Sequence, residues 1–173
     1  MRQWVSFLMA GVFLAAPALV WGASGAKPLD EQVRHELNML PFFSVFDYMN
    51  YRVDGDKVIL TGEVTRPWLK HDAETAIRRL SGVATVDDQI VVLPLSSFDD
   101  RIRLEELRAI YSNSVLHRYS LGPYAPIRIV VENGHVTLEG FVHSQMDKNV
   151  AGIAANTVSG VFSVKNNLSI DAT

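Results

Sequence analysis

The residues of this chain that could do chemistry are its five histidines, its hydroxyl side chains and its carboxylates, since it has no cysteine. Three possible metal ligands, His135, Glu139 and His143, share one face of a predicted strand. Same-face neighbours on a strand lie about 7 Å apart, so residues four and eight positions apart diverge beyond one zinc ion, whose bonds are about 2 Å long. We therefore predict solvent-facing histidines and no metal site.

A catalytic serine or threonine would need a base and an orienting partner close by. The sequence contains no Gly-x-Ser-x-Gly turn for such a nucleophile, and no glycine-rich loop that would hold a phosphate. Its glycines fall where turns and helix ends explain them. We expect no catalytic residues, no cofactor and no enzyme activity.

The composition is that of a globular protein, with 48% apolar residues among 173 and a formal net charge of −3. A slightly acidic chain has no general affinity for polyanions, so nucleic acid is not an expected partner.

The N-terminus has the features of an export signal. Arg2 precedes an apolar run over residues 5–20, and small residues follow at 22–26. Cleavage after Ala26 would leave a soluble periplasmic protein. The alternative is an uncleaved membrane anchor, because an apolar run of about 16 to 18 residues is at the lower limit for spanning a bilayer.

The rest of the chain is a repeat. A shift of 78 positions aligns residues 51–92 with residues 129–170 without a gap, and twelve of the 42 aligned pairs are identical. Nearly all of the identical residues are apolar or glycine. The repeat therefore preserves a scaffold and not a reactive group.

Each copy predicts the order α-β-β-α-β. Alternating apolar residues after Asp54-Gly55 and Asn133-Gly134 indicate the second strand of a hairpin. Gly62 and Gly140 occupy the same inward position, which suggests close approach of a helix. The hairpin is followed by an amphipathic helix, beginning at Pro67 in the first copy and capped by Ser144 in the second, and by a final strand over 83–93 or 161–170.

A leading helix completes each copy, opened by Asp30 in the first and by Asp99 or Asp100 in the second. We predict an α+β protein of two tandem domains, at residues 28–93 and 99–171, joined by a linker at 94–98. Each domain has a three-stranded sheet with two helices packed on one face. The second copy carries an insertion within 111–126.

The strings Val-x-Leu-x-Gly-x-Val and Gly-Val-x-x-Val, separated by a helix, occur in both copies, and the sequence resembles the BON domain of bacterial osmotically inducible periplasmic proteins. Asn166 and Leu168 fit the family's Val-x-Asn-x-Leu ending, whereas the first copy has Asp88 and Ile90 there. The resemblance implies a non-enzymatic envelope protein that binds phospholipid surfaces, with no catalytic residues to carry over.

The insertion is the first candidate binding segment, because amphipathic rings beside a cation suit a membrane interface or a protein partner. Its candidate residues are Tyr111, Leu116, Arg118, Tyr119, Leu121 and Tyr124. The alternative is that the segment extends the preceding helix and packs locally. Exposure of Tyr119, Leu121 and Tyr124 together would favour binding.

Two further features have alternative interpretations. Trp68, in the first turn of its helix, either dips into a headgroup layer or covers the edge of the core. Arg101, Arg103 and Arg108 form a basic stripe, but Glu105 and Glu106 lie among them, which favours an ion-paired, solvated face.

We therefore expect an exported, non-catalytic protein of envelope maintenance or osmotic stress, whose partner is an anionic phospholipid surface or an envelope protein. The alternative is a chaperone-like or structural protein-interaction module with no membrane contact. A third possibility, binding of a small ligand or ion between the two domains, predicts a pocket lined by both linker-facing helices, although no residue of the sequence requires one. An aromatic cluster ringed by Lys and Arg favours lipid, and a broad exposed apolar patch without neighbouring cations favours protein.

Overall fold

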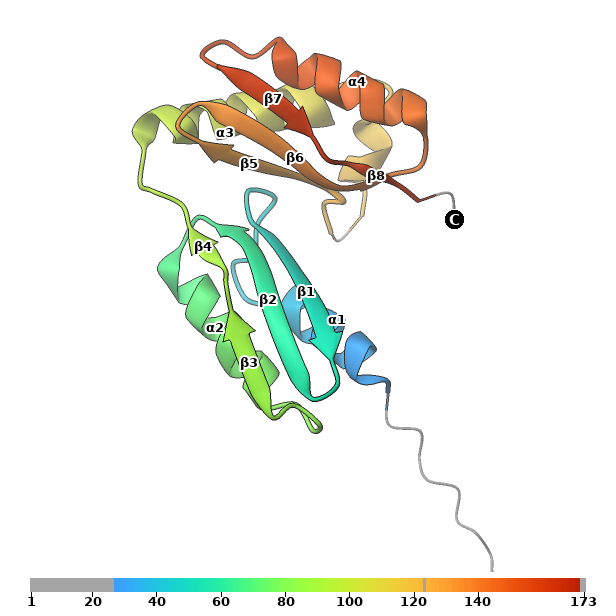
Figure 1. The fold of residues 1–173 in the computed structure, drawn as a ribbon. Helices are drawn as coiled ribbons and strands as arrows, with labels where there is room; N and C mark the ends of the chain where they lie inside the picture. The colour runs from blue at the N-terminus through green and yellow to red at the C-terminus, as the bar shows by residue number, and fades with distance from the viewer. Residues whose placement is uncertain (1–26, 123, 172–173) are drawn as a thin grey trace, which may run out of the picture.

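The computed structural model describes residues 27–122 and 124–171, so the predicted export signal lies outside the described residues. It contains two domains joined by a short extended linker (Figure 1). In the described ranges, no helix is long and apolar enough to cross a membrane.

The first domain runs in the order α1 (Leu29–Asn38), β1 (Tyr48–Asp54), β2 (Lys57–Val64), α2 (Pro67–Arg78), β3 (Thr85–Asp88) and β4 (Val91–Val92). The second contains α3 (Ser97–Tyr111), a 3-10 turn η1 (His117–Ser120), β5 (Ile127–Glu132), β6 (His135–Val142), α4 (Gln145–Asn156), β7 (Ser163–Asn166) and β8 (Ser169–Ile170).

The predicted fold class is confirmed, since each domain has an antiparallel hairpin whose second strand pairs in parallel with the final strand. Equivalent pairs have the same register, with Tyr51 opposite Leu60 and Ile129 opposite Leu138. Each domain has its own apolar core.

The conserved inward glycines have a different cause from the one predicted. A Cβ on Gly62 would lie 2.2 Å from the carbonyl oxygen of Tyr48, and one on Gly140 would lie 2.0 Å from that of Pro126. Their φ angles are 124° and 101°, which side-chain-bearing residues rarely adopt. The backbone of the neighbouring strand, and not a helix, therefore requires glycine at both positions.

The final strand of each copy is interrupted, where the sequence predicted a continuous one. The side-chain oxygen of Asp88 accepts a hydrogen bond from the Ile90 N–H at 2.9 Å, and that of Asn166 accepts one from the Leu168 N–H at 3.3 Å. This local turn places Ile90 and Leu168 in the cores. Both Asp and Asn supply the accepting oxygen, so the first copy's departure from the family ending preserves the geometry.

Helix α3 also corrects two predictions. It begins after Ser96, whose hydroxyl oxygen accepts from the Asp99 N–H at 3.2 Å, and not at the aspartates themselves. Arg103 and Glu106 do not belong to a solvated ion-paired face, because both are buried.

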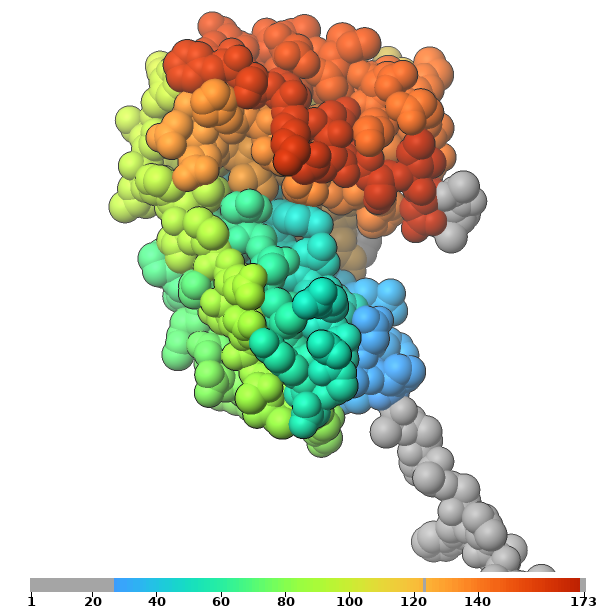
Figure 2. Space-filling model, viewed as in Figure 1, coloured from blue at the N-terminus to red at the C-terminus, as the bar shows by residue number. Residues whose placement is uncertain are grey.

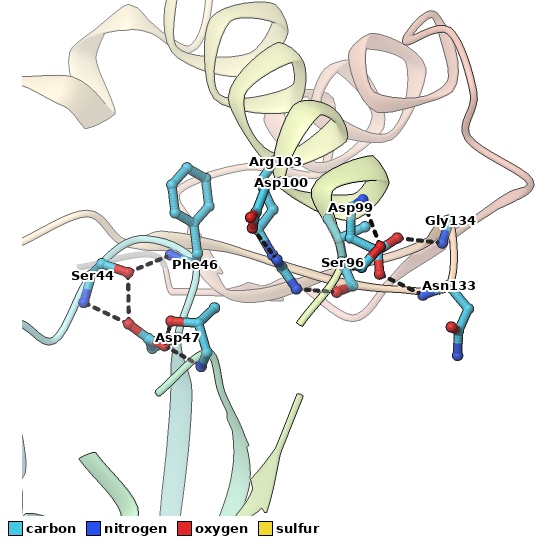
Figure 3. Close-up of polar contacts among 11 residues, drawn as sticks. Ser44, Phe46, Asp47, Ser96, Asp99, Asp100, Arg103, Asn133 and Gly134 are labelled. Atoms are coloured by element: carbon cyan, nitrogen blue, oxygen red, sulfur yellow. Dashed lines mark hydrogen bonds and ion pairs between the residues drawn. The ribbon is translucent and has the colours of Figure 1, made fainter. Parts of the chain in front are cut away.

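The two domains meet where the loop after α1 lies against the open edge of β5. The Ile129 N–H donates to the carbonyl of Val45 at 2.9 Å, and Arg128 donates to the carbonyl of Ser44 at 2.8 Å. Val45 and Phe46 pack against the second core, and Phe46 points from its loop toward α3 (Figure 3). Figure 2 shows the second domain, yellow-green at α3 and orange to red beyond it, seated across one end of the first.

Acidic side chains of the two sheets also approach one another at this junction. Burial raises the pKa of Glu63 on β2, and the negative charges of Glu139 and Glu132 raise it further.

Candidate functional site

The insertion does not form the exposed aromatic patch that would have favoured binding. Leu116 and Tyr119 are buried in the second core, with 0% and 4% of their surface exposed. The segment packs locally, as the alternative interpretation proposed, but it does so through η1 and not by extending α3, which ends at Tyr111.

Tyr119 instead organises the start of α4. Its hydroxyl donates to the buried carboxylate of Asp147 at 2.8 Å and accepts from the His143 N–H at 2.8 Å. The Asp147 carboxylate also pairs with Arg118, and the Asp147 N–H donates to the Ser144 hydroxyl at 3.1 Å. Burial opposes the charge on Asp147, but these hydrogen bonds outweigh it and hold the pKa of Asp147 below its ordinary value.

Tyr111 closes part of the edge of the second sheet. Its hydroxyl donates to the carbonyl of Ile127 at 2.6 Å, and burial raises the pKa of Tyr111 to about 12. Arg103 acts in the same way further along β5, donating to the carbonyl of Val131 at 2.6 Å. Together with the Val45 contact, these bonds occupy backbone groups that an edge strand would otherwise leave open.

Two insertion residues, Leu121 and Tyr124, are exposed, at 75% and 51%. The Tyr124 hydroxyl lies 3.7 Å from the sulfur of Met39, so the segment reaches the end of α1 in the first domain. The nearby Arg128 guanidinium is already engaged, with its centre 4.5 Å from the Phe43 ring centroid.

Trp68 is half-exposed and lies beside a cation. The guanidinium carbon of Arg66 is 5.5 Å from the centroid of the indole ring. No ion pair involves Arg66 in the described part of the chain. One aromatic ring beside one exposed cation is a smaller version of the feature expected of a lipid site, an aromatic cluster ringed by Lys and Arg.

Trp68 also lines a groove of about 710 Å³ between the domains. Residues from both domains and the linker form its walls: Ser44, Phe46, Thr65, Arg66, Pro67, Trp68, Leu95, Asp100, Arg103 and Leu104. Sequence reasoning placed Leu104 among the apolar residues of α3 and did not single out Arg66 or Leu95. One signal could have marked Leu104 as available for binding. It lies on a different face of α3 from Ile102, Glu106 and Ile110, which follow one another at the spacing of four residues and are buried.

Buried polar groups cluster around the start of α3 (Figure 3). The Asp99 carboxylate accepts from the N–H groups of Asn133 and Gly134 at 3.0 and 2.8 Å, which holds the helix to the β5–β6 turn. Neither carboxylate oxygen of Glu106 has a hydrogen-bond partner, and burial raises the pKa of Glu106 to about 8.

The histidines are not brought together as ligands. His135 Nδ1 lies 2.7 Å from the Ser163 hydroxyl and His143 Nδ1 lies 3.2 Å from the carbonyl of Asp171. Within the described ranges, no group of three His, Asp or Glu side chains is placed to hold a metal ion.

Comparison with protein families matches the chain to the BON domain over residues 26–94 and 111–172. No curated protein matches it significantly.

Among the solved structures that are similar to this chain are two of CdsD, described as a structural protein of the type III secretion system of Chlamydia trachomatis. The first, its C-terminal domain, is 13% identical, with a TM-score of 0.31, over 85% of this chain and 99% of that one. The second is 12% identical, with a TM-score of 0.30, over 83% of this chain and 92% of that one. These likenesses carry no functional argument. The family match covers both copies of the repeat and most of the sequence, and the protein therefore belongs to the BON-domain family.

Proposed function

We propose that this protein is an exported, non-catalytic envelope protein that binds an anionic phospholipid surface at the junction of its two domains. The observation that carries the proposal is the pairing of the half-exposed Trp68 with Arg66, which has no ion-pair partner among the described residues.

The residues around this pair support the same assignment. Leu95 of the linker is 97% exposed and Leu104 of α3 is 48% exposed, and both line the groove beside Trp68. An indole ring places its apolar body among acyl chains and its N–H among headgroups. The Arg66 guanidinium adds attraction of about 1 kcal/mol to an anionic surface. Envelope maintenance or the response to osmotic stress is the setting that we propose for this binding.

Co-sedimentation with phosphatidylglycerol vesicles at low salt tests the proposal. We expect the wild-type chain to sediment with the vesicles. The Arg66→Ser/Trp68→Ser variant should partition onto the vesicles at least about fivefold more weakly, since loss of the arginine charge alone lowers partitioning about fivefold. Met146→Ser is the matched control, since Met146 is the aligned residue of the second copy and is 66% exposed. Equal sedimentation of the double variant and the control, or none of the wild type, would contradict the proposal.

A second candidate function is binding of an envelope protein, without membrane contact, through the surface around Tyr124. Leu121 and Tyr124 are exposed, Tyr124 lies beside Met39, and the nearby cation Arg128 is already bound to Ser44 and Phe43. Apolar surface without a free cation suits protein better than anionic lipid. Cross-linking to envelope proteins that is lost in Leu121→Ser/Tyr124→Ser, with vesicle binding unchanged or absent, would support this candidate.

A further inference from the structure

The groove between the domains has the size and lining of a site for one small molecule. Its volume of about 710 Å³ lies within the range of roughly 300–1,000 Å³ found for ligand pockets, which occur preferentially at domain interfaces. The first turn of α2 and the first two turns of α3 form its walls, together with the linker and the loop after α1. Phe46, Trp68, Leu95 and Leu104 make these walls largely apolar.

The polar groups of the groove favour an anion. Arg66 stands at its rim without an ion pair in the described ranges. Arg103 is 4% exposed and lines the wall. Its two terminal nitrogens donate to the Asp100 carboxylate and to the carbonyl of Val131, while its Nε has no hydrogen-bond partner. The single acidic residue of the lining, Asp100, is paired with Arg103, which leaves Arg66 as the exposed cation of the lining. The buried Asp47 carboxylate behind Ser44 and Thr65 is occupied by four hydrogen bonds from these two residues.

The start of α2 adds to this preference. Helices α3 and α4 have a serine cap and an aspartate in the first turn, and α1 has acidic residues there. Helix α2 has no side-chain cap and no acidic residue in its first turn, and its N-cap residue is Arg66. The positive end of its helix dipole therefore has no compensating charge on α2 itself, while the buried Asp47 carboxylate accepts from the N–H and the hydroxyl of Thr65, just before the helix.

We infer that the groove binds a single-chain anionic amphiphile, with the alkyl chain against Trp68, Leu95 and Leu104 and the anionic head group beside Arg66. The inference rests on the proposed function in one respect, that both require the apolar and cationic surface at the junction. It adds that the ligand enters as one molecule in a site built by both domains. A flat vesicle surface cannot fill such a concave site.

Quenching of Trp68 by a bromine-substituted stearate, below its micelle-forming concentration, tests the inference. The sequence has three tryptophans, so the full chain carries Trp4→Phe and Trp21→Phe to leave Trp68 as the reporter. We expect saturable quenching with one ligand per chain. Leu104→Gln weakens binding at least about tenfold through lost apolar contact, and Arg66→Gln weakens it about fivefold through the lost charge.

Two controls separate the site from general apolar adsorption. Ile153→Gln on α4, where Ile153 is 67% exposed and outside the groove, leaves the affinity unchanged. A brominated alcohol of the same chain length binds the wild type more weakly than stearate, and Arg66→Gln does not change its affinity.

Quenching that does not saturate, or that is equal in Leu104→Gln and Ile153→Gln, would overturn the inference. Vesicle sedimentation of the same proteins distinguishes it from the proposed function. A wild type that sediments with vesicles but shows no saturable quenching contradicts the groove site alone. Saturable quenching without sedimentation supports the groove site and contradicts binding to a membrane surface.

Discussion

The two copies of the repeat satisfy the same backbone group with different side chains. In the first, the Thr65 N–H donates to the buried Asp47 carboxylate at 2.7 Å. In the second, the N–H of the aligned His143 donates to the Tyr119 hydroxyl at 2.8 Å, and a buried carboxylate, Asp147, stands behind it. What the fold preserves is therefore the hydrogen bond at the end of the hairpin, because a buried N–H must be paired.

The leading helices of the two copies, α1 and α3, differ at an equivalent core position. Val33 and Leu37 of α1 align with Ile102 and Glu106 of α3, so a carboxyl group in the second copy occupies a core position that is leucine in the first. Glu106 has no partner to offset its burial. The comparison shows that the second domain carries a destabilising polar group that its fold does not require.

The largest predicted loss of stability concerns the inward glycine that the two copies share. Gly62→Ala and Gly140→Ala should each unfold their own domain, with a cost above about 4 kcal/mol, since the added methyl would overlap a backbone carbonyl. Gly82→Ala is the control, because Gly82 also has a positive φ of 93° but open space around it. It should cost only about 1–2 kcal/mol.

Hydrogen exchange followed domain by domain measures this effect. Equal losses in all three glycine variants would show that the close approach of the strands is not the reason for glycine at residues 62 and 140.

The next effect concerns Glu106 and depends on pH. Its pKa is about 8 in the folded state against an ordinary 4.5. Below pH 4.5 both states are protonated, and as the pH rises toward 8 only the unfolded state loses its proton, so stability falls across this window. The loss is on the order of 3 kcal/mol by pH 7, and Glu106→Leu, which copies Leu37, should recover it.

Urea unfolding at pH 5 and pH 8 measures the change. Glu106→Gln should make the loss of stability across this window much smaller, whereas Glu105→Gln on the same helical turn should retain it. A wild type as stable at pH 8 as at pH 5 would sink this account of Glu106.

A smaller effect tests whether Tyr119 in the second copy has the role that Asp47 has in the first, as acceptor for the N–H at the end of the hairpin. Tyr119→Phe removes the hydroxyl from Asp147 and from the His143 N–H, and should cost about 1–3 kcal/mol. Asp47→Asn should cost at least as much in the first domain, because all four contacts of its carboxylate are with donors.

Thermal unfolding measures the cost of each variant, and amide hydrogen exchange at residues 65 and 143 in the folded protein locates it. Faster exchange at residue 143 in Tyr119→Phe, with residue 65 unchanged, is the expected pattern. Unchanged exchange at residue 143 would contradict the assignment.

The smallest effect concerns the interrupted final strand. Asn166→Asp keeps the oxygen that accepts from Leu168 but loses the donor to the carbonyl of Lys148, and should cost about 1 kcal/mol. Asp88→Asn keeps the bond to Ile90 and should change stability by less than about 1 kcal/mol, since it gives up only a partly exposed pairing with Lys70 at 3.8 Å. Denaturant midpoints decide between this view and one in which either exchange disrupts the strand.

The sequence by itself determined the repeat, the order of elements, the fold class, the start of α2 at Pro67 and the cap at Ser144. These features follow from local causes, namely alternation of apolar residues, the fixed φ of proline, and hydroxyl groups that bond to their own helix. The sequence also identified the inward glycines, although their reason lay in the neighbouring strand.

Only the tertiary structure decided which amphipathic residues are available for binding. The sequence treated Tyr119 and Tyr124 alike, but Asp147, 28 residues away from Tyr119, draws its hydroxyl into the core. Leu104 has an apolar side chain like Ile102 and Ile110 of the same helix, yet it faces the junction, where the first domain and the linker complete a groove around it. A local pattern specifies that a residue is apolar, whereas the elements packed around it decide whether that residue fills a core or lines a site.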